Sequence, residues 1–455
     1  MSCSQIINYV VKNDLCTGCG LCTLACSNNS LKMELNEYGF YVPVKIKECN
    51  SECQCIKVCP FNPTPDLEVQ TENEIANIFL QENLHIQSQI GRYTGLYTGY
   101  SIENRLSSSS GGIATYILTE LLKKGIIQHV ICVKESKIAE KHYEYTISST
   151  EEELKRASKT KYYPVTLENS LKKIKDLNGN VAIVGVACFI KGIRLAQYYD
   201  PSLKEKINFL IGIICGGIKS TFFAEYLASK TGVSPTEYTK PNFRVKDINS
   251  TASDYAFSCT NKIGEEKLIK MWKVGDMWGT GLFKANACDF CDDVTTELAD
   301  ISLGDAWLEP FSNDGKGTNV IVTRSKLAEK LLQEGISKKE ISITKLPKER
   351  FIASQQGSFN HRHTGLLYRK NKALSKNIQI APKRFDNQNI SFLLKLIQKM
   401  RMQTRKKSLE CWKEEKNAQL FDKRMHTSLF ILKKLTRLNH IQRGIIRRIK
   451  KVLSL

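Results

Sequence analysis

The chain has 455 residues, enough for roughly two to four domains with sizeable cores. With 42% hydrophobic and 25% charged residues, its composition excludes wholesale disorder and low-complexity polymers. The net charge of +21 is unevenly placed, because residues 361–455 contain 25 Lys and Arg against 5 Asp and Glu, a net +20 that leaves +1 for the first 360 residues. Attraction to anionic surfaces is therefore expected in the last fifth of the chain.

No segment has the features of a membrane span or an export signal. The longest apolar run, residues 181–190, has ten residues, against the roughly 20 that cross a bilayer. The N-terminus lacks a basic region followed by an apolar stretch. We therefore expect a cytoplasmic protein. Its 16 cysteines then favour metal binding over disulfides, because the cytosol keeps thiols reduced.

Two runs of four cysteines precede position 60. The first run has the C-x2-C-x2-C-x3-C spacing of bacterial ferredoxins and consists of Cys16, Cys19, Cys22 and Cys26. The second run has its second cysteine displaced by one position and consists of Cys49, Cys53, Cys55 and Cys59. Thiolates at this spacing wrap around 4Fe-4S clusters.

In two-cluster ferredoxins the fourth cysteine of each run binds the cluster of the other run. This rule predicts one cluster held by Cys16, Cys19, Cys22 and Cys59, and a second held by Cys49, Cys53, Cys55 and Cys26. A structural zinc site is the alternative, but zinc takes four ligands in two pairs rather than eight in two such runs. Residues 27–48 are expected to form a hairpin between the runs.

Downstream, a loop rich in Ser and Gly at residues 107–112 precedes a predicted helix over residues 113–124, whose apolar side chains share one face. Hydroxyls, glycines and a helix N-terminus together suit a phosphate or pyrophosphate. A serine N-cap beside a flexible loop has the same pattern, so the residues alone leave both interpretations open.

Two apolar runs, residues 181–186 and 209–214, are typical of parallel strands buried on both faces. Each is followed closely by a cysteine, and ligands of open α/β sheets bind beyond the carboxyl ends of the strands. A C-x2-C pair occurs further along. These four residues predict a third iron–sulfur site, and they are Cys188, Cys215, Cys288 and Cys291. The alternative is that the first two are small buried hydrophobic side chains.

Taken together, these motifs resemble the beta subunit of coenzyme F420-reducing hydrogenase and the coenzyme F420 hydrogenase/dehydrogenase beta-subunit family. The resemblance covers about residues 10–355. Besides the ferredoxin-like front, the motifs are residues 108–112, 159–162, 185–194, 212–217, 242–244, 288–291 and 299–307, in the order of the family.

The resemblance implies a protein that joins FAD to iron–sulfur clusters. Clusters accept single electrons whereas hydride transfer needs two, and a flavin can do both. Matched by position, the FAD contacts would be Ser110, Gly111, Gly112, Lys161 and Tyr162, with Arg244 and Asp305 as further candidates. A surface salt bridge is the alternative role for Arg244, and a helix N-cap is the alternative for Asp305.

The chain departs from its relatives at residues 185–189, where Gly-Val-Ala-Cys-Phe replaces the usual Gly-Thr-Pro-Cys-Gln. The hydride acceptor is therefore left open. Coenzyme F420 is one candidate, but the family also includes flavin reductases with other acceptors, among them a chlorophyll-pathway reductase driven by ferredoxin. A redox partner protein or ferredoxin is the expected electron partner.

Residues 429–455 predict a basic amphipathic helix, with Leu, Ile and Val at helical spacing and Lys and Arg on the other faces. Such a helix can bind an anionic membrane surface at the inner face of the membrane, or pack on the protein's own core. Nucleic-acid binding is disfavoured, because base-stacking aromatic residues are not interleaved with the charges.

We expect a mixed α+β and α/β chain of four parts. These are a dicluster ferredoxin-like domain (residues 1–80), a region that resembles the N-terminal part of the F420 hydrogenase beta subunit (90–168), a region that resembles its C-terminal part (169–355) and a basic helical tail (356–455). The resemblance implies that the two middle regions form a mixed α/β, flavin-binding catalytic part. The leading hypothesis is an iron–sulfur flavoprotein oxidoreductase. The alternatives are an electron-relay subunit whose partner carries the substrate site, and a membrane-docked assembly component associated with surface-polysaccharide biosynthesis.

Overall fold

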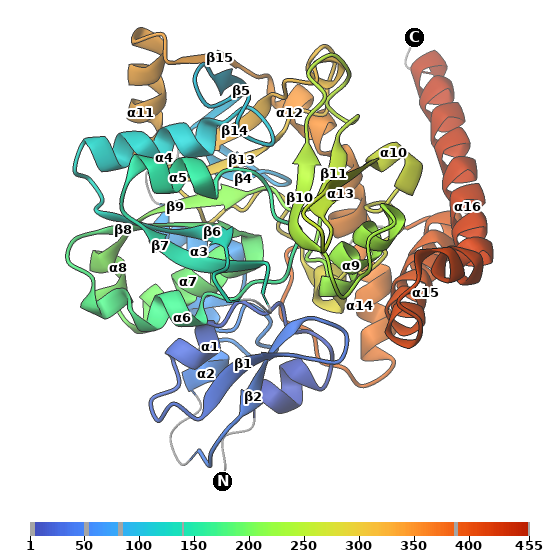
Figure 1. Cartoon of the computed structure of the whole chain (residues 1–455), viewed down its shortest axis with the longest axis horizontal. Coiled ribbons are helices and arrows are strands. Elements are labelled where there is room, and N and C mark those ends of the chain that lie inside the picture. Colours follow the sequence, from blue (N-terminus) through green and yellow to red (C-terminus); the bar gives the residue numbers. More distant parts are fainter. Residues whose placement is uncertain (1–4, 50–53, 81–84, 139–140, 386–389, 454–455) are drawn as a thin grey trace.

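The computed structural model describes residues 5–49, 54–80, 85–138, 141–385 and 390–453. Its centre is an eight-stranded mixed sheet in the order β15-β5-β14-β13-β9-β8-β6-β7 (Figure 1). The central pairs β13/β9, β9/β8 and β8/β6 are parallel, and the outer pairs are antiparallel. The strands are β5 (Gly95–Ser101), β6 (His129–Glu135), β7 (Tyr143–Ser148), β8 (Val181–Val186), β9 (Ile207–Ile213), β13 (Ile301–Asp305), β14 (Asn319–Thr323) and β15 (Ile341–Lys345).

Helices cover both faces of this sheet, because the apolar side chains of the central strands alternate between two hydrophobic clusters. In β8, for example, Ala182 packs on one side and Ile183 on the other. One face is covered by α4 (Ile113–Lys123), α5 (Glu151–Ala157) and α11 (Lys326–Ser337). The other is covered by α3 (Glu72–Phe79), α6 (Glu168–Lys172), α7 (Ala187–Tyr199) and α8 (Ser202–Lys206).

The mixed α/β architecture expected from the sequence is confirmed. The predicted helix over residues 113–124 is α4, and Gly125 follows it with a φ of +63°. The predicted parallel strands are β8 and β9, although β9 begins two residues early, at Ile207. A further difference concerns Cys188, which lies in the first turn of α7 rather than in a loop before the helix.

The N-terminal part contains the predicted hairpin, formed by antiparallel β1 (Leu31–Leu35) and β2 (Tyr41–Lys45). Around it lie a π-helical turn (Ile6–Val11), α1 (Leu21–Leu24), α2 (Gln54–Lys57) and a 3-10 turn (Leu67–Val69). The hairpin tip sits on the body of the protein, where the Thr221 N–H donates to the Gly39 carbonyl at 3.1 Å. Gly39 has a φ of +72°, and a Cβ there would lie 2.1 Å from the Thr221 hydroxyl. Glycine is therefore required at this contact.

A three-stranded antiparallel sheet lies beside the central one and consists of β10 (Thr239–Val245), β11 (Ala256–Thr260) and β12 (Glu266–Lys270). It packs against α9 (Thr221–Lys230), and α10 (Met271–Val274) follows it. A small hairpin of β3 (His85–Gln87) and β4 (Gly91–Tyr93) precedes β5.

The chain beyond residue 355 is largely packed against the rest of the molecule. It forms α13 (Gln356–Phe359), a π-helical turn (Asn360–Thr364), α14 (Leu366–Leu374), α15 (Phe392–Glu414) and α16 (Ala418–Leu453), after α12 (Lys348–Ser354). The helices α15 and α16 pack on each other and on α9 through aromatic residues. Within the part of the chain that is described, no helix is both long and apolar enough to cross a bilayer.

Trp412 anchors this C-terminal packing, since its side chain is fully buried and its indole N–H donates to Glu225 at 2.9 Å. We predict that Trp412→Ala lowers the free energy of unfolding by about 3–5 kcal/mol, through the cavity it leaves. Trp272 is 68% exposed and provides the matched control, so Trp272→Ala should change stability by about 0.5 kcal/mol or less. Urea denaturation followed by circular dichroism measures both. Equal effects of the two substitutions would contradict the packing of α15 and α16.

Candidate functional site

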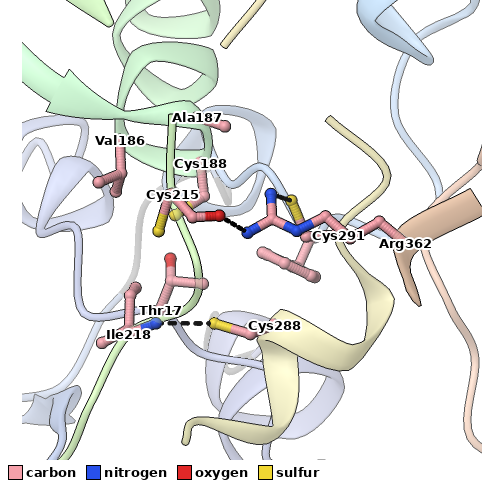
Figure 2. Close-up of a pocket in the computed structure, with 10 residues that line it drawn as sticks. Thr17, Val186, Ala187, Cys188, Cys215, Ile218, Cys288, Cys291 and Arg362 are labelled. Carbon is pink, nitrogen blue, oxygen red and sulfur yellow. Dashed lines mark hydrogen bonds between the residues drawn. The ribbon is translucent and has the colours of Figure 1, made fainter. Parts of the chain in front are cut away.

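Four thiols line one cavity at the carboxyl end of the central strands (Figure 2). Cys188 follows β8 and Cys215 follows β9. Cys288 lies in a 3-10 turn, Asn286–Phe290, and Cys291 directly follows that turn. The cavity holds about 270 Å³ of space, part of it open to solvent. The structure thus brings together the four cysteines predicted for the third site. The other lining residues are Thr17, Phe61, Val186, Ala187, Ile218 and Arg362.

Three of these sulfurs accept hydrogen bonds. The Gly217 N–H donates to Cys215 Sγ at 3.2 Å, and the Ile218 N–H donates to Cys288 Sγ at 3.2 Å. Gly217 has a φ of +130°, and a Cβ there would lie 2.8 Å from the Lys284 side chain, so this turn requires glycine. Donors aimed at sulfur stabilise the thiolate form, which is the form that binds metal.

Arg362 is the third donor and the cation of this cavity. Its guanidinium is 4% exposed, contacts Cys291 Sγ at 3.5 Å and also donates to the Cys215 carbonyl (Figure 2). Burial alone would lower the pKa of Arg362, but the facing Cys291, Cys215 and Cys288 raise it. The guanidinium therefore stays charged and partly balances negative charge on the sulfurs.

The thiols are costly to ionise when nothing else balances them. Burial, together with the nearby Cys215, raises the pKa of Cys288 to about 12. Burial and four neighbouring thiols raise the pKa of Cys188 well above its usual value. Four sulfurs around a buried space fit a polynuclear iron–sulfur cluster, whose iron ions would neutralise them. In the described ranges, no three Cys, His, Asp or Glu side chains converge closely enough to hold a single metal ion.

A second cavity, of about 310 Å³, lies in the N-terminal part. It is lined by the four cysteines that the crossed-ligand rule assigns to one cluster, Cys16, Cys19, Cys22 and Cys59. Burial and the neighbouring Cys19 raise the pKa of Cys16 to about 12. Thr17 and Phe61 line both cavities, so the two thiol groups are immediate neighbours.

The remaining N-terminal cysteines form a third group. Burial, Cys26 and Cys49 together raise the pKa of Cys55 to about 11, and the Ser30 N–H donates to Cys26 Sγ at 3.1 Å. All three thiols are buried in one hydrophobic cluster, together with Cys22 of the neighbouring cavity. Cys53, the fourth ligand predicted here, lies outside the described residues.

The Ser and Gly loop before α4 is held from several sides. Ser110 Oγ donates to the Thr318 carbonyl at 3.0 Å, and Ser109 Oγ accepts from the Thr160 N–H at 2.8 Å. Gly112, with a φ of +80°, forms the N-cap of α4 beside Gly111. Ser108 Oγ, by contrast, is buried without a hydrogen-bond partner. This free hydroxyl is consistent with a polar ligand at the loop.

Two partly buried ammonium groups flank this loop. Lys161 Nζ donates to the carbonyls of Ser158 and Lys159 at 2.5 and 2.9 Å, and burial lowers its pKa to about 8. Lys246 Nζ donates to the Ser110 carbonyl at 2.8 Å, and burial and the charge of Arg244 lower its pKa to about 8. The sequence analysis missed Lys246, which lies two residues after the expected Arg244.

Arg244 and Asp305 form a buried ion pair, with Arg244 Nη1 2.7 Å from Asp305 Oδ2. Arg244 thus forms a salt bridge, as its alternative role from the sequence has it, but it is 6% exposed and not on the surface. Asp305 ends β13 and does not cap a helix. Arg244 Nε is buried without a partner. The pair lies next to Tyr162. Burial raises the pKa of Tyr162, although the charge of Arg244 lowers it.

Aromatic contacts connect the surroundings of the Arg244–Asp305 pair to the thiol cavity. Tyr162 packs edge-on against Trp278 with ring centroids 4.7 Å apart. Trp278 in turn covers Gly216, where a Cβ would lie 3.0 Å from the indole. Since Gly216 follows Cys215 directly, one wall separates the predicted flavin residues from the predicted third cluster.

A buried charge network under the cavity also escaped the sequence analysis. Lys284 Nζ lies 2.6 Å from Asp289 Oδ1 and 3.1 Å from His361 Nε2, and Arg405 Nε lies 3.1 Å from Asp289 Oδ2. The only sequence signal was the His-Arg-His triplet at residues 361–363, in a chain with seven histidines. Residues so far apart have no spacing that reveals their contact.

Comparison with known proteins gives the family. Residues 96–172 match the family model for the N-terminal part of the coenzyme F420 hydrogenase/dehydrogenase beta subunit. Residues 178–349 match the model for the C-terminal part of the same beta subunit. Together they span more than half of the chain, which belongs to the coenzyme F420 hydrogenase/dehydrogenase beta-subunit family.

Three relatives show the range of this family. The chain is 25% identical over 368 residues to coenzyme F420-dependent sulfite reductase of Methanocaldococcus jannaschii, covering 76% of this chain but about half (51%) of that protein. It is 23% identical to a subunit of the F(420)H(2) dehydrogenase of Methanosarcina mazei, covering 75% and 88% of the two chains. It is 25% identical to the beta subunit of the coenzyme F420 hydrogenase of Methanothermobacter thermautotrophicus, covering 54% and 83%.

Among solved structures, a chain of the F420-reducing NiFe hydrogenase complex from Methanosarcina barkeri is similar, with a TM-score of 0.47 and 18% identity. The match covers 64% of this chain and 97% of that one.

Arg362 gives a testable consequence for the cavity. We predict that Arg362→Gln lowers the reduction potential of a bound cluster, on the order of 60 mV or more, because reduction adds negative charge that the buried guanidinium stabilises. Arg362→Lys keeps the charge and should shift the potential less. An anaerobic redox titration followed by electron paramagnetic resonance measures both. An unchanged potential in the Gln variant at full iron content would contradict this role.

Proposed function

We propose that this chain is an oxidoreductase that passes electrons between iron–sulfur clusters and FAD, and exchanges hydride with an acceptor through FAD. The observation that carries the proposal is the order of the sites. The cavity of Cys188, Cys215, Cys288 and Cys291 shares Thr17 and Phe61 with the N-terminal cavity on one side. On the other side it adjoins the Trp278 and Tyr162 pair through Gly216.

The proposed division of work follows from the residues. The clusters would supply one-electron steps and the flavin would couple them to two-electron hydride transfer. The cysteines hold the clusters, while Arg362 and the N–H donors of Gly217 and Ile218 stabilise charge on the sulfurs. The loop around Ser108 and the cations of Lys246 and Arg244 would bind the anionic and polar parts of FAD.

Coenzyme F420 is the first hydride acceptor or donor to test, because F420 or its reduced form F(420)H(2) stands in the names of all three relatives described above. The departure at residues 185–189 does not argue against it. Val186 and Ala187 line the thiol cavity, so the lost hydroxyl and proline alter the surroundings of the proposed cluster. We further propose a redox partner protein or ferredoxin, since two of these relatives are named as subunits.

A cytoplasmic location accompanies the proposal. The cysteines proposed as cluster ligands must be reduced, and the cytosol keeps thiols reduced.

Metal and flavin analysis tests the proposal. Anaerobically purified protein should contain about twelve irons, about twelve acid-labile sulfides and one FAD per chain, since each cubane carries four irons. Replacing Cys288 and Cys291 with Ser should remove about four irons and leave about eight. Cys259→Ser is the control, because this buried thiol lies outside all three cysteine groups. Zinc in place of iron with no flavin, or unchanged iron in the double variant, would contradict the proposal.

Ser108 tests the flavin site separately. Because its hydroxyl has no partner, Ser108→Ala should leave the thermal stability of the flavin-free protein unchanged. It should nevertheless weaken FAD binding about tenfold through one lost hydrogen bond. Ser110→Ala, which breaks the bond to Thr318, should lower stability as well. Titration of flavin-stripped protein with FAD, followed by fluorescence, gives the affinities. Unaltered affinity in Ser108→Ala would exclude contact between this hydroxyl and FAD.

A further inference from the structure

The long helix α16 has two apolar faces, and only one of them packs on the protein. On the inner face Phe421, Met425 and Leu432 are buried, at 1%, 0% and 2% exposure. The outer face consists of residues at helical spacing that are 40–54% exposed, namely Ile431, Leu438, Ile441, Ile445 and Ile449. Figure 1 shows α16 along the outer edge of the molecule, beside α15 and away from the N-terminal part.

The charge of this segment is of one sign. After Asp422 the sequence contains ten Lys and Arg and no Asp or Glu. Lys434 is exposed within the outer apolar face and Arg437 is exposed next to it, and neither forms an ion pair with a described residue. Lys433 and Arg443 are exposed on other faces of the helix, where Arg443 donates to Asn360 Oδ1 at 3.3 Å. The exposed apolar strip is thus accompanied by cations that have no ion-pair partner among the described residues.

From this combination we infer that the outer face of α16 docks on an anionic lipid surface. Leucine and isoleucine side chains enter the interfacial region, and the flanking Lys and Arg reach lipid phosphates. The inference is independent of the proposed redox function, and it leaves the N-terminal cysteine domain free for a protein partner.

A second copy of the chain fits the outer face of α16 less well than an anionic lipid surface does. A parallel coiled coil on the seven-residue repeat of Ile431, Leu438 and Ile445 would place Lys434 in its core. It would also bring two segments with ten cations each against one another, which is strongly unfavourable. The helix offers few aromatic side chains on which nucleic-acid bases could stack, because Phe430 and His440 are the aromatic residues of the sequence after His426.

Vesicle flotation of the full-length protein tests the inference. Wild type should bind vesicles of equal parts phosphatidylcholine and phosphatidylglycerol at least ten times better than pure phosphatidylcholine, and less as salt is added. Replacing Leu438, Ile441 and Ile445 with Gln should abolish binding without loss of helix content, because these side chains are exposed. The control replaces Ile263 and Leu268, which are exposed on another surface, with Gln, and should bind like wild type.

Three results would overturn the inference. They are absence of binding to anionic vesicles, binding that survives the triple substitution, and a dimer in solution that the triple substitution dissociates. The last result would assign the face to a second copy of the chain. None of these outcomes depends on the content of iron or flavin, so they are distinguishable from failure of the proposed function.

Discussion

Burying four thiols around one cavity carries an electrostatic cost that the surrounding chain must offset. Burial and the neighbouring Cys215 raise the pKa of Cys288 to about 12, although Lys284, the Ile218 N–H and Arg362 lower it, so that this thiol stays protonated unless a bound cation neutralises it. Much of the local architecture serves that compensation. Two backbone N–H groups and the Arg362 guanidinium point at the sulfurs, and Gly217 adopts a backbone conformation that places its N–H beside Cys215.

The same constraint explains why distant segments converge. The thiols come from the ends of β8 and β9 and from a turn near residue 290, Thr17 and Phe61 come from the N-terminal part, and Arg362 comes from the chain beyond the family match. Buried contacts of His361 with Lys284 and Asp289 hold the π-helical turn at residues 360–364 in place. Through Arg362, the chain beyond residue 355 thus contributes to the cavity.

Local signals made much of this predictable. Ligand spacing identified the N-terminal cysteines, and continuous apolar runs located β8 and β9 and hence the two cysteines that follow them. The contributions of Arg362, Lys246 and Trp278 could not be read from the sequence, because each acts across more than 60 residues or between separate sheets. The burial of Arg244 was equally hidden, since nothing in its neighbourhood reveals the partner Asp305.

We propose that electrons cross the cavity between the N-terminal thiols and the predicted flavin residues. Rapid mixing of the anaerobic holoprotein with a reduced ferredoxin, while flavin and cluster absorbance are followed, tests it most directly. The flavin should become reduced in wild type, whereas Cys215→Ser should show reduced N-terminal clusters with an oxidised flavin. Flavin reduction at the wild-type rate in Cys215→Ser would mean that electrons do not pass through this cavity.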